Sequence, residues 1–475
     1  MTTLARLTAA LALALPALAD AAAIIRGPFL QQTTPSSTLV VVKTGVAASV
    51  RAVATLPGGQ TVEATTSGTH HVLRLEGLPA ASEIAYRVLL DGVERSSGLV
   101  RTPGAPGTAA GRRAVIGVMG DHGTAEPVAV ANGERLRERG VSALFTVGDN
   151  AYPDGATADW DPRMFQPFAP LLRSTTLWPV PGDHEYRTPG AQPYLEAHEL
   201  PEGPEGERYY SFDWGDIHVV ALDSNCIVPL VAAEAGCTTA SMTTWLRADL
   251  AASDAPWKFA LIHRPAVATG KYGVYPQIPA ALVPIFQEFG VDLVLEGHNH
   301  LYERTWPTKD GVPTQMDYDH PTAPVYVTSG GAGNWLYDFA LPAAPWTAYR
   351  EKIDQHVVLT LEDGTLKVES ITGAGVVHDT FTIVKDIPPL TAPGGGGDTG
   401  GDTGGDDGGG VPGGEQPAPQ VAAGSSGCAS SGSAGLLSLA ALAAAAYAVR
   451  RRRTLAAARV PAKGARRATR RAYRP

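Results

Sequence analysis

Residues 114–123 read AVIGVMGDHG, and residues 143–152 read ALFTVGDNAY. Each stretch begins with an apolar run typical of a buried strand, and each continues into Gly-Asp and further residues with polar side chains. Open α/β sheets bind their ligands in the loops that follow the carboxyl ends of strands. The two stretches therefore predict a layered α/β domain with a polar site at its strand ends.

The same alternation of strands and helices continues from residue 113 to about residue 385. It predicts the fold class α/β (α+β), with a two-sheet β-sandwich flanked by helices. The expected helices cover residues 132–139, 243–252 and 282–289. The further expected strands cover residues 209–213, 217–222, 258–262, 292–295, 325–328, 357–361 and 366–371. The segment 152–177 is expected to be a loop after the second motif.

Five polar motifs follow apolar runs in this region. In order they are Gly120-Asp121-His122-Gly123, Gly148-Asp149-Asn150-Ala151-Tyr152, Gly182-Asp183-His184-Glu185, His263 and Gly297-His298-Asn299-His300. Carboxylates bridge and neutralise hard cations, imidazoles complete their coordination, and glycine lets the backbone approach an ion closely. One such motif alone is commonly a turn or a hydrogen-bonded core residue. Five together predict a site for a pair of metal ions.

These motifs resemble those of the calcineurin-like metallophosphoesterases and, within them, the purple acid phosphatases. The resemblance is carried by Asp149-Asn150-Ala151-Tyr152 and by residues 298–304, HNHLYER, and it spans residues 27–385. It implies a first metal held by Asp121, Tyr152 and His300, and a second held by Asp183, His263 and His298. Asp149 would bridge both metals, and His184 would lie beside the substrate phosphate without binding a metal.

The implied activity is that of an acid phosphatase, a binuclear metal-dependent hydrolase of phosphate monoesters. Two cations act as Lewis acids on the phosphoryl oxygens and lower the pKa of a bound water toward about 7, which yields a hydroxide nucleophile. The metals and His184 would stabilise charge on the equatorial oxygens. A phenolate from Tyr152 favours Fe(III) at the first site, and the second site suits Zn, Mn or Fe(II). The expected partner is a small-molecule phosphate ester.

Two alternative functions fit the same motifs. One is a phosphodiesterase or nucleotide hydrolase on the same metal site, and the other is a catalytically impaired surface binding protein. Asp183 stands where the family usually has asparagine, which adds a negative charge and predicts tighter metal binding in a less electropositive site. The family's additional histidines after His263 are replaced by Thr269–Gly273, TGKYG. There Lys271 or Tyr272 could donate a proton or bind phosphate, unless Lys271 is a plain exposed loop residue.

Two other histidines are expected to have structural roles. His122 follows Asp121 directly, and such a side chain commonly points away from the metal. His218 lies within the expected strand 217–222 and is interpreted as part of the packing.

Residues 25–103 are expected to form a small β-sandwich, because short β-branched runs alternate with turns and show no helical period. The expected strands cover residues 38–43, 51–55, 71–75 and 84–90, with turns at Pro57-Gly58-Gly59 and Asp91-Gly92. The stretches GPFLQ (27–31) and LEGLP (75–79) are similar to the fibronectin-type domain found ahead of purple acid phosphatases. Residues 104–112 are the expected linker to the catalytic domain at 113–385.

Both ends of the chain are expected to be targeting segments. Residues 1–22 have the pattern of a secretory signal peptide, and the Gly/Asp/Pro-rich residues 386–427 predict a flexible linker. Residues 428–453 contain Cys428, an apolar run and an Arg cluster, and they resemble the C-terminal sorting signals of myxobacterial surface proteins. A single-pass membrane anchor is the alternative, and the basic tail 454–475 departs from such signals. The expected location is the cell surface, with a C-terminal processing enzyme as a further partner.

Charge and cysteine content limit the function classes. The net charge of the 475 residues is −9, although residues 450–475 carry ten Arg and one Lys without any Asp or Glu. The acidic body argues against nucleic-acid binding, which requires basic surfaces. Three cysteines cannot make a disulfide-rich scaffold. Cys226 and Cys237 are expected to form a disulfide, as exported proteins retain such bonds, with two free buried thiols as the alternative.

Overall fold

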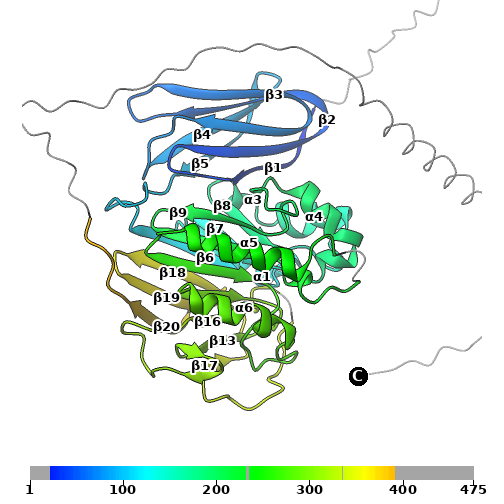
Figure 1. Ribbon diagram of the computed structural model, residues 1–475. Coiled ribbons are helices and arrows are strands. Elements are labelled where there is room, and N and C mark those ends of the chain that lie inside the picture. The colour runs from blue at the N-terminus through cyan, green and yellow to red at the C-terminus, as the bar shows by residue number, and fades with distance from the viewer. Residues whose placement is uncertain (1–21, 232–234, 334, 391–475) are drawn as a thin grey trace, which may run out of the picture. The chain divides into compact units, whose positions relative to one another are not determined.

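The computed structural model describes residues 22–231, 235–333 and 335–390 (Figure 1). The predicted signal peptide up to residue 21, most of the predicted linker, and the segments 428–453 and 454–475 lie outside the described residues. Among the residues described, no helix is both long and apolar enough to cross a membrane.

Five antiparallel strands form the N-terminal region. They are β1 (Ile24–Gln31), β2 (Ser37–Thr55), β3 (Thr61–Glu76), β4 (Glu83–Leu90) and β5 (Val93–Arg101). Strand β2 pairs with β1, β3 and β4, and β4 pairs with β5. Side chains that include Val40, Leu73 and Val88 form a separate apolar core. The predicted turn at Asp91-Gly92 is present, and both residues have positive φ angles, 49° and 81°.

The N-terminal strands are hydrogen-bonded to the rest of the chain. Strand β1 pairs in parallel with β8 (Thr176–Val180), where Leu30 is opposite Thr176. The resulting sheet has the order β20-β19-β18-β6-β7-β8-β1-β2-β4-β5, with β3 beside β2. The expected strand-only character of this region is confirmed. Its identity as a fibronectin type III-like domain and the boundary at residues 104–112 stay predictions.

Two sheets form the larger region, as the sequence predicts. The first adds β6 (Arg113–Met119), β7 (Ala143–Val147), β18 (His356–Glu362), β19 (Thr365–Ile371) and β20 (Val377–Val384). The second has the order β17-β13-β16-β12-β11-β10-β9. Its strands are β9 (Tyr210–Trp214), β10 (Ile217–Leu222), β11 (Trp257–Ile262), β12 (Leu293–Glu296), β13 (Tyr302–Thr305), β16 (Val325–Ser329) and β17 (Thr347–Glu351), and a small ribbon pairs β14 (Thr308–Lys309) with β15 (Val312–Pro313). Val118 and Leu144 of the first sheet share one core with Val219 and Leu293 of the second.

Three longer helices accompany the sheets (Figure 1). They are α1 (Pro127–Glu138), α5 (Thr239–Ala252) and α6 (Gln277–Glu288). Leu246 of α5 and Phe286 of α6 are fully buried in a second apolar cluster with Val220 and Val294 of the second sheet. Helix α1 begins five residues before the expected start, at Pro127, because proline is favoured in the first turn of a helix.

The expected loop at residues 152–177 is wrong in part. It contains α2 (Thr157–Trp160), a π-helical turn at Asp161–Phe165 and α3 (Ala169–Leu172), and it runs into strand β8. Helices of four residues are too short to produce a detectable apolar period. The remaining short elements are α4 (Gln192–Ala197) and 3₁₀ turns at Glu185–Arg187, Pro189–Ala191 and Ser224–Cys226.

Parallel strands bring the predicted motifs to one edge of the fold. Strands β6, β7 and β8 run parallel to one another, as do β10, β11, β12 and β16. The five motifs lie in the loops after β6, β7, β8, β11 and β12. The carboxyl ends of these strands are therefore the place where the candidate ligands meet.

The predicted disulfide between Cys226 and Cys237 is confirmed. The two sulfur atoms are 1.99 Å apart, and the Cα atoms are 5.1 Å apart. The alternative of two free thiols is excluded, and the bond closes the loop between β10 and α5.

His218 has the structural role that the sequence predicts. Its Nδ1 lies 2.8 Å from Asp213 Oδ1, and its Nε2 lies 2.9 Å from Asp249 Oδ2. Burial alone would lower the pKa of His218, but the hydrogen bonds and charges of the two carboxylates raise it to about 9. The imidazolium thus ties β10 to α5 and β9.

This contact predicts a pH-dependent contribution to stability. Because the pKa of His218 is higher in the folded chain than in the unfolded chain, its contribution is full below about pH 6.5 and is lost as the pH rises through about 9. We expect His218→Gln to lower the melting temperature clearly at pH 6 and much less at pH 9.5. Thermal unfolding of both proteins at the two pH values measures the difference, and an equal loss at both would contradict the assignment.

Candidate metal centre

Every predicted ligand lies at the expected strand end. Asp121 follows β6, Asp149 and Tyr152 follow β7, Asp183 and His184 follow β8, His263 follows β11, and His298 and His300 follow β12. All the predicted metal ligands are buried except Asp183, which is partly buried. The structure brings them together in two neighbouring groups.

The first group consists of Asp121, Asp149 and His300, whose potential ligand atoms lie within 4.8 Å of one another. The hydroxyl of Tyr152 joins them, at 2.9 Å from Asp149 Oδ2 and 3.3 Å from Asp121 Oδ1. His300 Nε2 lies 3.2 Å from Asp121 Oδ1. Its Nδ1 donates to the carbonyl of Trp335 (2.8 Å), which leaves Nε2 as the ligand atom.

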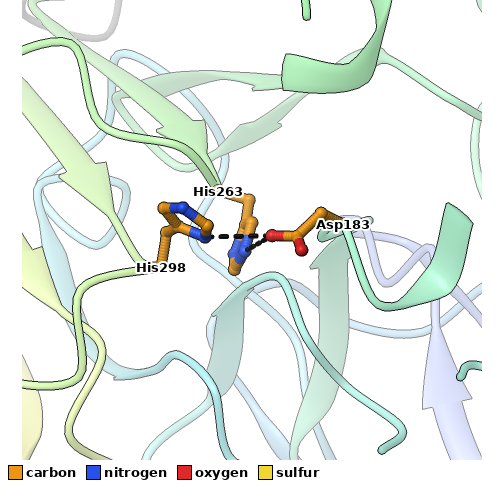
Figure 2. A group of neighbouring side chains, drawn as sticks. All are labelled: Asp183, His263 and His298. Atoms are coloured by element: carbon orange, nitrogen blue, oxygen red, sulfur yellow. Dashed lines mark hydrogen bonds and ion pairs between the residues drawn. The ribbon is translucent and has the colours of Figure 1, made fainter. Parts of the chain in front are cut away.

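The second group consists of Asp183, His263 and His298 (Figure 2). Both imidazoles point at one carboxylate oxygen: His263 Nε2 lies 3.1 Å and His298 Nδ1 lies 2.9 Å from Asp183 Oδ1. His263 Nδ1 donates to the carbonyl of Val147 (2.8 Å), so the ring orientation is fixed as in His300.

Asp149 connects the two groups. Its Oδ2 accepts from Tyr152 in the first group, and its Oδ1 lies 3.4 Å from His263 Nε2 in the second. Oδ1 also accepts from the backbone N–H of His184 (3.0 Å). One carboxylate is therefore within reach of ions in both groups, as the bridging role requires.

The charges in the centre favour cations. Burial opposes ionisation of Asp121 and Asp183, but the neighbouring histidines hold the pKa of both carboxyl groups below the ordinary value. Burial would lower the pKa of His263, yet Asp149, Asp183 and Asp121 raise it to about 10. The carboxylates thus attract positive charge, which a metal ion supplies once the imidazoles lose their protons.

Backbone geometry also fits a metal centre. Asp121, Asp149 and His298 adopt positive φ angles of 57°, 54° and 67°, a left-handed conformation that is uncommon for residues other than glycine and tends to cluster at functional sites. The His298 nitrogen that faces the second group is Nδ1, 2.9 Å from Asp183 Oδ1. A third group, formed by Glu205, Cys226 and Cys237, does not fit a metal, since its cysteines are in the disulfide.

Two glycines leave room for these ligands. A Cβ atom on Gly182 would lie 2.1 Å from Asp149 Oδ1, and one on Gly148 would lie 2.4 Å from His263 Nδ1. Gly148 also has a φ of 88°. The Gly-Asp pairs of the motifs are therefore required by close approach of the backbone to the ligands.

Glu185 is a positioning residue that sequence reasoning missed. Its buried carboxylate accepts four backbone hydrogen bonds, from Gly182 (2.6 Å), Asp149 (3.1 Å), Asn150 (2.9 Å) and Ala151 (3.1 Å). Burial and the nearby Asp149 raise its pKa to about 8, although the Gly182 and Ala151 N–H groups oppose this shift. It ties the loop after β8 to the loop after β7. The sequence signal that could have identified Glu185 is its place in the motif Gly182–Glu185.

His184 lines a cleft of about 890 Å³ beside the centre. The cleft is also lined by Tyr152, Pro153, Arg163, Arg187, Tyr272, Trp335 and Tyr337. His184 Nε2 lies 3.8 Å from Asp149 Oδ2, and its Nδ1 donates to the carbonyl of Pro153 (2.5 Å). His184 thus lies next to Asp149, and its place beside the substrate phosphate stays a prediction.

Lys271 and Tyr272 stand where the family has additional histidines, and both lie at the cleft. Tyr272 lines the cleft, with its ring 4.8 Å from that of His298. The Lys271 ammonium lies 4.2 Å from the ring centre of Tyr337. His122 points away from the ligands, as expected: it is fully buried, its Nε2 lies 3.3 Å from Met164 Sδ, and burial lowers its pKa to about 4.

Comparison with known proteins identifies the class. Residues 114–302 match the family model of the calcineurin-like phosphoesterases, and residues 323–380 match that of the iron/zinc purple acid phosphatase-like protein C. The chain thus contains a metallophosphoesterase domain, which is a phosphatase-like hydrolase domain. More particularly, this domain is followed by a C-terminal segment of the purple acid phosphatase type.

Relatives and solved structures agree with that class. Human acid phosphatase type 7 is 28% identical over 276 residues, which cover 53% of this chain and 62% of the relative. Acid phosphatase A of Cryphonectria parasitica is 33% identical over 197 residues, or 37% of this chain and 39% of the relative. The chain thus spans less than two thirds of these relatives. The structure of purple acid phosphatase PPD1 from yellow lupin seeds aligns with a TM-score of 0.67 at 20% identity, covers 76% of this chain and 74% of that chain, and confirms the predicted fold class.

Proposed function

We propose that this chain is an exported, surface-anchored acid phosphatase that hydrolyses small phosphate monoesters with two metal ions. The observation that carries the proposal is the pair of ligand groups connected by Asp149, beside a cleft that Tyr152 and His184 line. Its relatives include named acid phosphatases, which supports the monoester reaction.

Each ligand group would hold one ion. Asp121, Asp149, Tyr152 and His300 would hold the first, for which a phenolate favours Fe(III), and Asp149, Asp183, His263 and His298 would hold a second, Zn, Mn or Fe(II). When bound, the ions supply Lewis acidity at the phosphoryl oxygens and an activated water. The protein's contribution is to fix these ligands through Glu185 and the histidine contacts to Val147 and Trp335.

Two cleft side chains would act on the substrate directly. His184 lies on the side of the first group, since its ring is 4.3 Å from that of Tyr152. Its Nε2 accepts from Arg187 Nη2 (2.8 Å), and it would donate to a phosphoryl oxygen only when it carries a proton in place of that hydrogen bond. Tyr272 lies on the side of the second group, and its backbone N–H donates to Asn299 Oδ1 (3.0 Å). Its phenol would contact the leaving-group oxygen, whereas Lys271 is occupied with the Tyr337 ring.

The proposed location is supported by the Cys226–Cys237 disulfide, which persists in oxidising compartments. Anchoring through residues 428–453, and a processing enzyme that recognises them, remain part of the proposal. They are tested by following the full chain with antibodies to both of its ends in membrane and extracellular fractions.

The activity is tested on the purified full chain, loaded with Fe and Zn or Mn, with p-nitrophenyl phosphate and bis(p-nitrophenyl) phosphate at acidic pH. Faster monoester than diester hydrolysis supports the proposal. The reverse order would favour the phosphodiesterase alternative, to which an open cleft of this size is also suited. Two bound ions without hydrolysis of either ester would favour the binding-protein alternative.

Asp183 gives a specific prediction about the second ion. Its carboxylate accepts from both His263 and His298, and asparagine would keep the shape while removing one negative charge. We expect Asp183→Asn to weaken binding of the second ion by about 10-fold and to lower KM for an anionic substrate. Competitive metal titration and steady-state kinetics measure the two effects, with the exposed Asp254→Asn as control. Unchanged or tighter binding in Asp183→Asn would contradict this role.

A further inference from the structure

The cleft beside the metal centre contains more positive charge than a phosphate alone requires. Arg163 and Arg187 both line it, and both are exposed. Glu126 is the one carboxylate outside the ligand groups that lines it in the described part of the chain. A volume of about 890 Å³ exceeds that of a phosphoryl group, so the leaving group of the substrate also fits inside.

Arg187 is held close to the ligands. Its Nη2 donates to His184 Nε2 (2.8 Å), and its Nη1 donates to the carbonyl of Pro153 (3.2 Å). Asp154 lies 3.5 Å from the guanidinium, and both of these side chains are about half exposed. Such an exposed ion pair is weak, so the guanidinium remains available to an anion in the cleft.

Arg163 comes from the π-helical turn Asp161–Phe165. Its Nη1 donates to the carbonyl of Thr124 (2.5 Å), and within residues 22–231, 235–333 and 335–390 it forms no ion pair. The guanidinium is therefore anchored by a neutral group and keeps its charge uncompensated. Turns of the π type are rare and occur frequently at functional sites.

The N-terminal strand β1 holds this turn in place. Arg26 Nε lies 2.5 Å from Asp161 Oδ1, and the Arg26 side chain is 6% exposed. The Arg26 guanidinium also lies 4.3 Å from the ring centre of Phe165. The ring centres of Phe29 and Phe165 are 4.7 Å apart. Asp161 precedes Arg163 by two residues, so the partly buried ion pair fixes the backbone that presents Arg163 to the cleft.

We propose that Arg163 and Arg187 form a second anion-binding subsite, which selects phosphate monoesters whose leaving group carries a further negative charge. Arg26 of the N-terminal region is a positioning residue for this subsite, which gives that region a role in substrate selection. The inference rests on the proposed phosphatase function for its substrate class, but binding to the subsite does not depend on turnover.

The test compares phenyl phosphate with 4-carboxyphenyl phosphate at pH 6, where the added carboxylate is ionised. The metal-loaded full chain is expected to have the higher kcat/KM for the carboxylated ester. Arg163→Gln should reduce that value by about 10-fold and change the value for phenyl phosphate by less than about two-fold. Arg173→Gln is the matched control, because Arg173 lies in the same segment, donates to the carbonyl of Ala169 and does not line the cleft. Equal losses for both esters in Arg163→Gln would overturn the subsite.

The variant Arg26→Gln shows whether Arg26 positions Arg163 or only stabilises the folded protein. We expect it to lower the preference for the carboxylated ester by about three-fold or more at a temperature well below its own melting point, with phenyl phosphate hydrolysis retained. A lowered melting temperature with an unchanged preference would overturn the role of Arg26.

Binding of two non-hydrolysable analogues, phenylphosphonate and 4-carboxyphenylphosphonate, keeps the two proposals distinguishable. Calorimetry should show tighter binding of the carboxylated phosphonate to the wild-type protein and no such difference in Arg163→Gln. Tighter binding without hydrolysis of either ester would overturn the phosphatase function and retain the subsite. Hydrolysis of both esters with equal binding of the phosphonates would overturn the subsite alone.

Discussion

Asp149→Asn is expected to reduce the metal content from two ions per chain to one or none. The Asp149 carboxylate reaches Tyr152 in the first ligand group and His263 in the second, so its loss removes a ligand from both ions. Asparagine removes the negative charge and directs an N–H group at one of these neighbours. We expect kcat/KM for p-nitrophenyl phosphate to fall by at least about 100-fold. Elemental analysis and steady-state kinetics measure the two effects.

Asp254→Asn is the matched control, since this aspartate is exposed and belongs to neither ligand group. It should retain two ions and the wild-type rate. If Asp149→Asn kept two ions with unchanged affinity, the bridging role would be wrong. Circular dichroism of both variants shows whether the fold is retained, because a loss of structure would lower metal content for another reason.

Glu185→Gln is expected to have the second largest effect, on stability and metal affinity together. The carboxylate accepts hydrogen bonds from four backbone N–H groups of two loops. A glutamine amide can accept with its oxygen only, and its NH₂ group would face donors, so at least one buried N–H loses its partner. We expect a loss of about 3 kcal/mol in the free energy of unfolding. Urea unfolding at about pH 9, above the pKa of Glu185, measures it.

Loss of this tether should also weaken metal binding, because the Asp149 backbone and the Gly182 turn would lose their fixed separation. Dissociation constants for both ions should rise by about 10-fold or more. Glu196→Gln is the control, as Glu196 lies on α4 and its carboxylate contacts the exposed Gln192. A Glu185→Gln protein with wild-type stability and wild-type metal affinity would contradict the positioning role.

Most of the fold could be predicted because buried strands appear as apolar runs. Strands β7 and β10 have the predicted bounds, residues 143–147 and 217–222. Strand β8 was missed because Pro179 lies inside it, and proline within a run argues against a central strand. The segments 38–43 and 51–55 belong to one long strand, β2, whose pairing with β3 shifts register between Lys43 and Ala48. Gly45 lies within that irregular stretch, and a glycine there predicts the end of a strand, although β2 continues through it.

The ligands could be predicted because each follows a strand, and parallel strands place their carboxyl ends at one edge. The roles of Glu185 and Arg163 could not be predicted, because they depend on contacts between segments that are distant in the sequence. The role of Glu185 depends on where four N–H groups from two loops converge. That of Arg163 depends on a π-helical turn held by Arg26, which is 135 residues earlier than Asp161. The role of Arg163 leaves no periodic or local pattern in the sequence, and the motif Gly182–Glu185 marks Glu185 without showing which groups it contacts.

The central claim is that two ions lie between these side chains, and anomalous diffraction from crystals of the metal-loaded chain tests it most directly. We predict two peaks, one coordinated by Asp121, Asp149, Tyr152 and His300 and one by Asp149, Asp183, His263 and His298. A visible absorption band that disappears in Tyr152→Phe would identify the first ion as Fe(III). A single peak, or no peak after loading with Fe and Zn or Mn, would contradict the binuclear centre.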